Sequence, residues 1–291
     1  MARIINNLAE VAHLYDAAFV DLWGCVHDGV TTFPEAVEAL RGFRAAGKKV
    51  VLLTNAPRSR REVQKQLVRW GVPDDAWDTI ATSGDSARAA MFRGAVSNKV
   101  WFVGGDEDFP FFEPIHIVHE PVPIERVALD EAEGIVCTGP FDAFADPAEM
   151  RPQLLYAKQK GLKLLCANPD IVVDRGGTRE WCAGAIAALY TEMGGESLYF
   201  GKPHPPIYDL ARARLVEAGG DPVSPVLCIG DGVMTDVKGG LGEGLDTLFI
   251  TGGLAAAETA TAPGGQPEGS KLETFLNAHE MAATYAIGFL R

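Results

Sequence analysis

Residues 19–29 read FVDLWGCVHDG, and no other stretch of the chain is as informative. The apolar run from Ala17 to Val20 predicts a buried strand, and Asp21 follows directly after it. Glycine and polar residues come next. A carboxylate at the carboxyl end of a strand in an open α/β sheet lies where ligands bind, because loops and helix N-termini converge there. The stretch therefore predicts a functional site at Asp21.

The bulk properties limit the class of protein. The chain has 291 residues, enough for one large or two medium domains with hydrophobic cores. Its formal net charge of -13 argues against a nucleic-acid partner, because binding a polyanion requires a basic surface. No apolar run approaches the roughly 18 residues of a membrane span, and the first residues lack the pattern of a secretory signal. We therefore expect a cytoplasmic protein with neither nucleic-acid nor membrane partners.

The five cysteines are odd in number, and none forms a Cys-x-x-Cys pair. Most lie in apolar runs, where burial as a small apolar residue is the expected role. Cys25 alone is close to Asp21 in sequence. A functional thiol there would need a cationic neighbour or a helix N-terminus, so we expect Cys25 to be buried and inert as well.

Short apolar runs alternate with amphipathic segments, which predicts βα units and a mainly parallel sheet. At the centre the chain changes character, and an acidic, proline-rich segment at 105–133 interrupts the pattern. We predict a smaller α/β domain at 83–182, inserted into a domain formed by 1–82 and 183–291. Within the latter we expect a mobile loop at 252–270, which is rich in glycine, alanine, threonine and proline, and a terminal helix at 272–290.

Four polar islands accompany these runs. They are Asp21, then Thr54-Asn55 after an apolar strand, then Gly201-Lys202-Pro203, and last Gly230-Asp231 with Thr235-Asp236 close behind. Because strands of a parallel sheet end at one side of it, we expect these residues to meet. Alone, each island could simply cap a turn or a helix. Together they supply carboxylates, a hydroxyl, an amide and an ammonium, a set that suits Mg²⁺ binding and phosphoryl transfer.

The four islands resemble the motifs of the haloacid dehalogenase (HAD) superfamily. In particular they are similar to class IIA, the NagD-type and 4-nitrophenylphosphatase-like capped phosphatases. The family pattern is Asp-x-Asp-Gly, then Thr/Ser-Asn, then Lys before Pro, then Gly-Asp-x-x-x-Thr-Asp. Segments 167–170 (ANPD) and 183–188 (AGAIAA) add to the similarity, which runs from about residue 14 to about residue 255. The resemblance implies a Rossmann-like core with an inserted C2-type α/β cap.

The resemblance also implies a role for each motif residue. Asp21 would be the nucleophile, and Asp21, the main-chain carbonyl of Trp23 and Asp231 would hold Mg²⁺, with Asp236 in support of this metal site. Lys202 would neutralise Asp21 and the phosphate. Thr54 and Asn55 would position the phosphoryl group. The implied activity is hydrolysis of a small phosphorylated metabolite through an aspartyl phosphate, and relatives of this class often pair through their caps, which makes a homodimer an option.

Position 23 departs from the family pattern. In the family an acid stands there, which protonates the leaving group and then activates water. The indole N–H of Trp23 can only donate a hydrogen bond. Three alternatives follow. His27 or Asp28 takes over the proton transfer, unless they merely pack and cap the turn at Gly29. The enzyme is slow or limited to good leaving groups. Or the chain is an inactive relative that binds a phosphorylated ligand.

Substrate selection is expected from the cap. The segment from Asn168 to Arg175 is the best candidate, with Asn168 and Asp170 near the substrate and Arg175 pairing with a second anionic group. A surface ion pair between Arg175 and Asp174 is the alternative. A dinucleotide-binding protein would need Gly-x-Gly-x-x-Gly after the first strand, which is absent. A receiver-type phosphoacceptor would be much shorter and uncapped.

Overall fold

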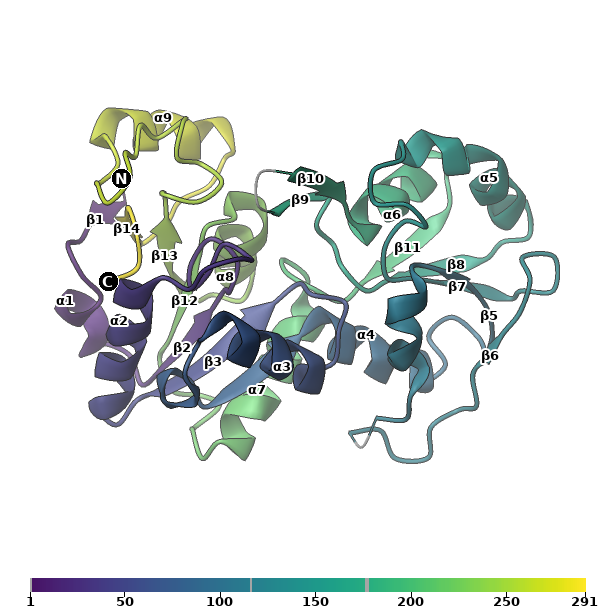
Figure 1. Cartoon of the computed structure of the whole chain (residues 1–291), viewed down its shortest axis with the longest axis horizontal. Helices are drawn as coiled ribbons and strands as arrows, with labels where there is room; N and C mark the ends of the chain where they lie inside the picture. Colours follow the sequence, from purple (N-terminus) through teal and green to yellow (C-terminus); the bar gives the residue numbers. More distant parts are fainter. Residues whose placement is uncertain (1, 116, 176–177) are drawn as a thin grey trace. The chain divides into compact units, whose positions relative to one another are not determined.

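The computed structural model describes the backbone of residues 2–115, 117–175 and 178–291, and the side chains of these residues except 174 and 175. By its internal contacts the chain divides into two compact units. The first unit comprises residues 1–54, 64–81 and 202–291, and the second comprises residues 55–63 and 82–201. Each unit has its own sheet (Figure 1), which confirms the predicted α/β class with one α/β unit inserted into another.

The first unit is built on a seven-stranded sheet in the order β1-β14-β13-β12-β2-β3-β4. These strands are β1 (Arg3–Ile4), β2 (Ala17–Val20), β3 (Lys49–Thr54), β4 (Thr79–Thr82), β12 (Val226–Gly230), β13 (Asp246–Ile250) and β14 (Tyr285–Ile287). The central strands β12, β2 and β3 pair in parallel. Every residue of β2 and β12 is buried. Their continuous apolar sequences are therefore typical of parallel strands covered on both faces.

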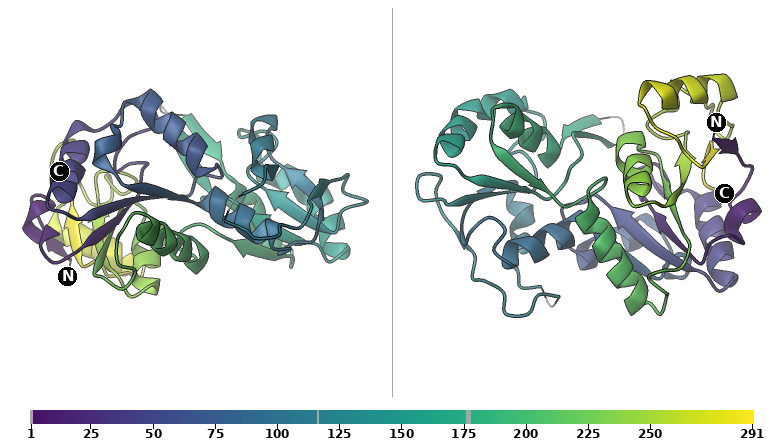
Figure 2. Two further views of the ribbon diagram at one scale, coloured as in Figure 1. Left: turned by 90° about the horizontal axis from the view of Figure 1, so that it is seen from below. Right: turned by 180° about the vertical axis from the view of Figure 1, so that it is seen from behind.

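Helices cover both faces of this sheet (Figure 2). They are α1 (Ala9–Ala12), α2 (Pro34–Ala45), α3 (Arg60–Trp70), η1 (Asp74–Ala76), α7 (Pro205–Glu217), η4 (Val233–Val237), α8 (Lys238–Gly242) and α9 (Gly269–Ala278). Helix α7 packs Ile207, Tyr208 and Leu215 into a core with Phe19 of β2 and Val51 of β3. Among the described helices of the whole chain, none combines the length and hydrophobicity that crossing a lipid bilayer requires.

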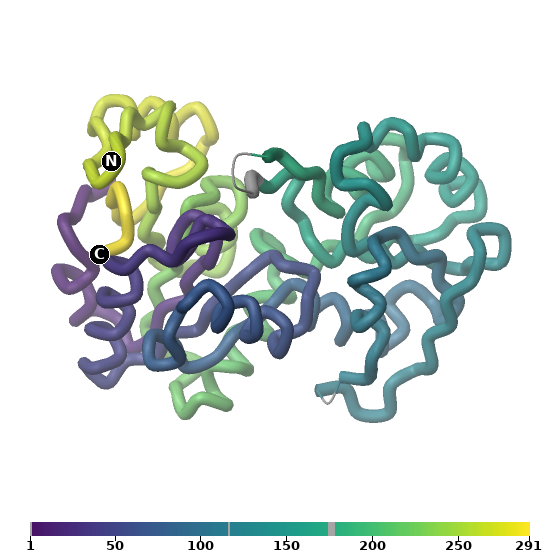
Figure 3. Tube along the Cα trace, in the orientation of Figure 1, coloured from purple at the N-terminus to yellow at the C-terminus, as the bar shows by residue number. Residues whose placement is uncertain are grey.

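The C-terminal segment differs from the predicted helix at 272–290. Helix α9 ends at Ala278, the chain turns at Glu280 with a positive φ of 55°, and it returns as β14. The apolar run of β14 pairs with β13 on one side and with β1 on the other, so the two ends of the chain lie side by side (Figure 3). Pairing between β13 and β1 therefore decides the conformation of residues 285–287, although the sequence before them has a helical pattern.

The predicted mobile loop at 252–270 is also corrected. Its first half forms consecutive turns. The buried hydroxyl of Thr261 donates to that of Thr251 at 2.8 Å, and the buried Thr259 hydroxyl donates to the Ala255 carbonyl at 2.7 Å. Threonine side chains thus satisfy the polar groups that a buried loop would otherwise leave unpaired. This segment is a packed part of the first unit.

The second unit holds a five-stranded parallel sheet in the order β11-β8-β7-β5-β6 and a separate hairpin, β9-β10. Its elements are α4 (Ser83–Phe92), β5 (Lys99–Val103), η2 (Asp106–Phe112), β6 (Glu125–Arg126), β7 (Gly134–Cys137), η3 (Pro147–Met150), α5 (Arg151–Gln159), β8 (Lys163–Cys166), β9 (Val172–Arg175), β10 (Thr178–Trp181), α6 (Ala183–Glu192) and β11 (Glu196–Tyr199).

The predicted end of the inserted domain at residue 182 is too early. Strand β11 pairs with β8, and Ile186 and Tyr190 of α6 lie in the core of the second sheet. The chain returns to the first unit only at Lys202. The apolar face of α6 and the short run of β11 carry no mark of which sheet they join, so local pattern could not place this boundary.

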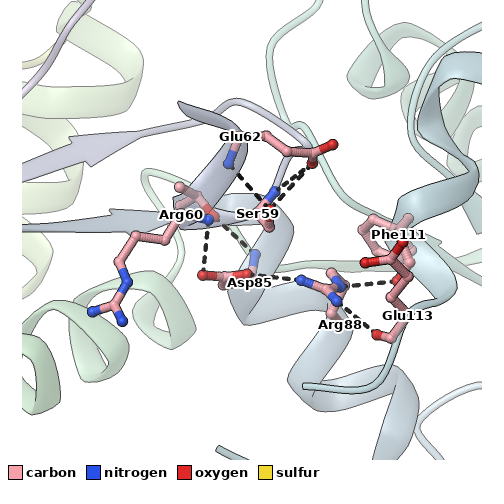
Figure 4. A network of polar contacts seen from close by, with 8 residues as sticks. Ser59, Arg60, Glu62, Asp85, Arg88, Phe111 and Glu113 are labelled. Carbon is pink, nitrogen blue, oxygen red and sulfur yellow. Dashed lines mark hydrogen bonds and ion pairs between the residues drawn. The ribbon is translucent and has the colours of Figure 1, made fainter. Parts of the chain in front are cut away.

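A buried polar network holds the segment 55–63 to α4 within the second unit (Figure 4). Ser59 and Glu62 form a capping box at the start of α3, each accepting from the other's main-chain amide at 3.3 Å. The buried Asp85 accepts from the amide of Arg60 at 3.1 Å and from the Arg88 guanidinium at 3.1 Å. Arg88 also donates to the carbonyls of Phe111 and Glu113 at 2.9 and 2.6 Å, and Figure 4 shows these contacts converging on it.

Candidate active site

Three neighbouring strands of the first unit end in buried polar residues. Asp21 follows β2, Thr54 is the last residue of β3, and Asp231 follows β12. The parallel register places these ends together, and the amide of Asp21 donates to the carbonyl of Ile229 in β12 at 2.8 Å. The sheet thus gathers three of the four predicted islands at its carboxyl side.

Lys202 joins two of the predicted carboxylates. Its Nζ donates to Asp21 Oδ1 at 2.6 Å and to Asp236 Oδ1 at 2.7 Å, and the lysine is 2% exposed. The second oxygen of Asp236 accepts from the amide of Gly232 at 3.1 Å and from the hydroxyl of Thr235 at 3.2 Å. Both oxygens of Asp236 therefore have hydrogen-bond partners, one of which is Lys202. Asp236 thus orients Lys202, and Lys202 in turn brings its positive charge to Asp21.

Glycines make room for these carboxylates. A Cβ on Gly24, whose φ is +76°, would lie 2.2 Å from Asp231 Oδ2, and a Cβ on Gly253 would lie 2.0 Å from the same oxygen. A Cβ on Gly230 would lie 2.0 Å from the carboxyl carbon of Asp236. The amide of Leu254, next to Gly253, donates to Asp231 Oδ2 at 3.0 Å. The loop after β13 thus supports the site, a role that its glycine-rich composition did not reveal.

Burial dominates the electrostatics of the site. Desolvation raises the pKa of Asp21 above its ordinary value, Asp236 adds to this, and Lys202 opposes it. Desolvation together with Asp21 and Asp236 raises the pKa of Asp231 well above its ordinary value. Burial alone would lower the pKa of Lys202, but the two ion pairs raise it above its usual range. Three carboxyl groups therefore share one ammonium group, and two of them ionise less readily than an exposed aspartate does.

A divalent cation fits this donor set. Asp21, Asp231 and Cys25 each bring a donor atom within 4.8 Å of the other two, and all three are buried. Asp231 accepts a hydrogen bond only through Oδ2 among the described contacts, which leaves Oδ1 for a ligand. Mg²⁺ prefers a few carboxylate oxygens, and its charge would offset the excess of buried carboxylates. Asp236, predicted as part of the metal site, is not in this group.

The side chain of Trp23 packs in an aromatic cluster. Its ring centroid lies 5.4 Å from that of His27 and 6.4 Å from that of Trp70, in edge-to-face geometries. A Cβ on Gly29, whose φ is +84°, would lie 2.2 Å from the indole. Such aromatic pairs add about 0.5–1.5 kcal/mol beyond burial. The indole thus stabilises the loop 23–29, and nothing in its chemistry supplies an acid.

His27 and Asp28 also have structural roles. His27 is 1% exposed, its Nδ1 accepts from the amide of Gly29 at 3.0 Å, and its Nε2 has no hydrogen-bond partner among the described residues. Burial lowers its pKa to about 4, with Asp28 acting in the opposite direction. Asp28 accepts from the amides of Val30 and Thr31 at 2.9 and 2.7 Å and so caps the turn. The described contacts therefore favour packing and capping over proton transfer.

The predicted substrate-binding residues belong to the second unit. Asn55 Nδ2 donates to Asp170 Oδ1 at 2.8 Å, and Asn168 Oδ1 accepts from the amide of Asp170 at 3.0 Å, so three of the four residues lie together. Gly184 allows α6 to approach them, since a Cβ there would lie 2.1 Å from the Pro169 carbonyl. The fourth, Arg175, ends β9, and its side chain lies outside the described part of the chain.

All five cysteines are buried, as expected. The position of Cys25 beside two carboxylates was not expected. Its only signal in the sequence is a spacing of four residues from Asp21, which does not by itself tell a packed thiol from a donor.

Comparisons with known proteins agree with this geometry. A family model described as haloacid dehalogenase-like hydrolase matches residues 18–116, and a HAD-hydrolase-like model matches residues 199–275. A haloacid dehalogenase-like hydrolase from Brucella suis 1330 is 36% identical, covers 99% of this chain and 100% of its own, and superposes with a TM-score of 0.83. The ribonucleotide monophosphatase NagD of Escherichia coli K12 is 24% identical over 80% of this chain and 86% of its own length. The 5'-nucleotidase YutF of Bacillus subtilis 168 is 24% identical over 85% and 91%.

Proposed function

This chain belongs to the haloacid dehalogenase-like hydrolases, and we propose that it is a Mg²⁺-dependent phosphatase of small phosphorylated metabolites. The observation that carries the proposal is the buried bridge from Lys202 to Asp21 and Asp236, next to the carboxylate of Asp231. The names of the relatives NagD and YutF, a ribonucleotide monophosphatase and a 5'-nucleotidase, support a phosphate ester as substrate.

In this proposal Asp21 is the nucleophile. One of its carboxylate oxygens attacks phosphorus, the bond from phosphorus to the leaving oxygen breaks, and the leaving group departs with the electron pair. Water then attacks the aspartyl phosphate, releases inorganic phosphate and restores Asp21. Lys202 holds Asp21 in place and lessens the repulsion between carboxylate and phosphate. The hydroxyl of Thr54, at the end of β3, donates to a phosphoryl oxygen.

Asp21, Asp231 and the main-chain carbonyl of Trp23 would hold Mg²⁺. The ion would supply positive charge against the phosphoryl oxygens. Asp236 keeps Lys202 aligned, since one of its oxygens accepts from Lys202 and the other accepts from the amide of Gly232, both within the first unit. Every one of these roles is independent of the side chain at position 23.

The side chain at position 23 determines which phosphates react. Trp23 cannot protonate a leaving group, and the contacts of His27 and Asp28 do not fit that role. General acid catalysis is worth about 10²–10⁴ in rate. We therefore propose a preference for phosphates whose leaving group is stable as an anion, such as phenyl esters and anhydrides, over alkyl esters.

Phosphate release tests the reaction. The assay uses 4-nitrophenyl phosphate and a panel of sugar, nucleotide and cofactor phosphates, with and without Mg²⁺. We expect release that requires both Mg²⁺ and Asp21 and is lost in Asp21→Asn. Asp16→Asn is the matched control, because Asp16 is an exposed aspartate just before the opposite end of β2. Release from no substrate, together with Mg²⁺-dependent binding of one of them, would instead indicate a ligand-binding relative.

A pair of variants tests the leaving-group preference. Trp23→Asp restores an acid at position 23, and Trp23→Leu removes the indole without adding one. We expect Trp23→Asp to exceed Trp23→Leu on an alkyl phosphate by about 10² or more, and to exceed it much less on 4-nitrophenyl phosphate. Equal ratios on the two substrates would contradict the assignment of position 23 as the missing acid.

A further inference from the structure

The candidate metal site contains a sulfur atom. Among the described residues, Asp21, Asp231 and Cys25 form the one group of three potential metal ligands whose donor atoms all lie within 4.8 Å of one another. Two of these residues are the carboxylates that the proposed function assigns to Mg²⁺. The third, a thiol, is a donor that Mg²⁺ does not favour.

The turn after β2 brings Cys25 back toward Asp21. The amides of Cys25 and Val26 donate to the carbonyl of Leu22 at 3.4 and 2.9 Å, and Gly24 between them has a φ of +76°. The chain therefore reverses within a few residues of the strand end. Cys25 is 1% exposed, so its side chain points into the unit rather than to solvent.

The thiol of Cys25 has no hydrogen-bond partner among the described residues. Two other buried cysteines differ in this respect, because the thiols of Cys137 and Cys166 donate to the carbonyls of Gly139 and Asn168 at 3.6 and 3.2 Å. Two carboxylates lie close to Cys25. Asp231 is itself 5% exposed, and among the described residues its Oδ1 accepts no hydrogen bond. A cation bound here could take all three donor atoms as ligands, because a buried thiol without a hydrogen-bond partner among the described residues lies beside two buried carboxylates.

We propose that Cys25 makes this a mixed oxygen and sulfur site, which binds thiophilic divalent cations through Asp21, Asp231 and the Cys25 sulfur. Thiolate ligands select softer ions such as Zn²⁺ and Cd²⁺, whereas carboxylates suit Mg²⁺. The proposal rests on the proposed function for the position of the metal at Asp21 and Asp231. It adds that zinc-like ions use a ligand that Mg²⁺ does not, and so displace Mg²⁺ from the site.

Cobalt spectroscopy of the whole chain tests the proposal. Co²⁺ bound through sulfur gives a strong sulfur-to-cobalt charge-transfer band in the near ultraviolet, whereas Co²⁺ bound through oxygen alone does not. We expect the band to saturate at one Co²⁺ per chain, to disappear in Cys25→Ser and to persist in Cys137→Ser. Cys137 is the matched control, a buried cysteine in the second unit.

Calorimetry adds a comparison of ions. Loss of a direct ligand should cost at least as much as loss of an outer-shell partner, which is worth 10–100-fold in affinity. We therefore expect Cys25→Ser to weaken Cd²⁺ at least about 10-fold more than it weakens Mg²⁺. Equal weakening of the two ions would overturn the proposal, because an oxygen-only site does not distinguish them at this position.

The unaltered protein gives a measurement that does not depend on a variant. In ¹¹³Cd magnetic resonance, sulfur-bound cadmium resonates far downfield of cadmium bound by oxygen alone, and we expect the downfield signal. No charge-transfer band, no binding of Co²⁺ or an upfield cadmium signal would each overturn the proposal. None of these readouts needs turnover, so the sulfur ligand can fail while Mg²⁺-dependent phosphate release succeeds, and the reverse.

Discussion

Acidification should destabilise this protein through His27. Burial lowers the pKa of His27 from 6.5 to about 4 in the folded chain. As the pH falls, the unfolded chain binds a proton at His27 first, so the folded state loses stability between about pH 6.5 and about pH 4. At about 1.4 kcal/mol per pH unit, this gap corresponds to about 3 kcal/mol of unfolding free energy. The stability is fully present above pH 6.5.

The variant His27→Phe isolates this contribution. It keeps an aromatic ring beside Trp23 and Trp70 and removes the titrating group. Urea unfolding followed by tryptophan fluorescence, at several values of pH from about 7.5 to about 4, should show the wild type losing about 3 kcal/mol more than the variant. His13→Phe, at an exposed position in the same unit, controls for the loss of a histidine as such.

The outcome bears on catalysis as well as on stability. Parallel curves for wild type and His27→Phe would refute the reasoning that the pocket holds His27 neutral. A neutral His27 whose Nδ1 is bonded to Gly29 is not a proton shuttle. The same variant should therefore lower turnover of good and poor leaving groups by the same factor. A selective loss on alkyl phosphates would restore His27 as the substitute acid.

Three further substitutions test the supports of the two units. Lys202→Met should abolish phosphate release and cost about 3–5 kcal/mol in urea unfolding, because it leaves buried carboxylates unpaired; an unchanged midpoint would contradict the ion pairs. Gly24→Ala should weaken Mg²⁺ binding more than about 10-fold in calorimetry, as expected for a disturbed metal shell, since its Cβ would lie 2.2 Å from Asp231 Oδ2. Gly42→Ala in α2, where a Cβ meets nothing, should leave that affinity as it was. Arg88→Ala should lower unfolding free energy by about 3 kcal/mol for the same reason as Lys202→Met, and thermal melting without a shift would speak against the network.

Much of the fold could be predicted because local pattern and tertiary role agree. The run from Ala17 to Val20, predicted as a buried strand, is the fully buried strand β2 in the structure. The family resemblance is confirmed by the matching models and the Brucella suis structure. Where a strand could join more than one partner, the hydrophobic pattern of its residues does not predict which strand it pairs with. Neither the assignment of β11 to the second sheet nor the return of β14 beside β13 is encoded in the periodicity of those residues.

In the candidate site, too, some residues could be placed from the sequence and others could not. Asp21, Thr54 and Asp231 could be placed together because strand ends of a parallel sheet share one side. The pairing of Asp236 with Lys202 and the support of Asp231 by Leu254 depend on loop conformation, which composition does not determine.

Position 23 separates two functions that one residue combines elsewhere in the family. In the proposed mechanism the metal is held through the main-chain carbonyl of position 23, which tryptophan supplies as well as aspartate does. Proton transfer requires a carboxyl group, which tryptophan lacks. The indole in return packs on His27, Trp70 and Gly29 and holds the loop that follows Asp21. A chain built in this way should keep metal binding and phosphoryl transfer while losing tolerance for poor leaving groups. The ratio between Trp23→Asp and Trp23→Leu on two substrates measures that loss directly.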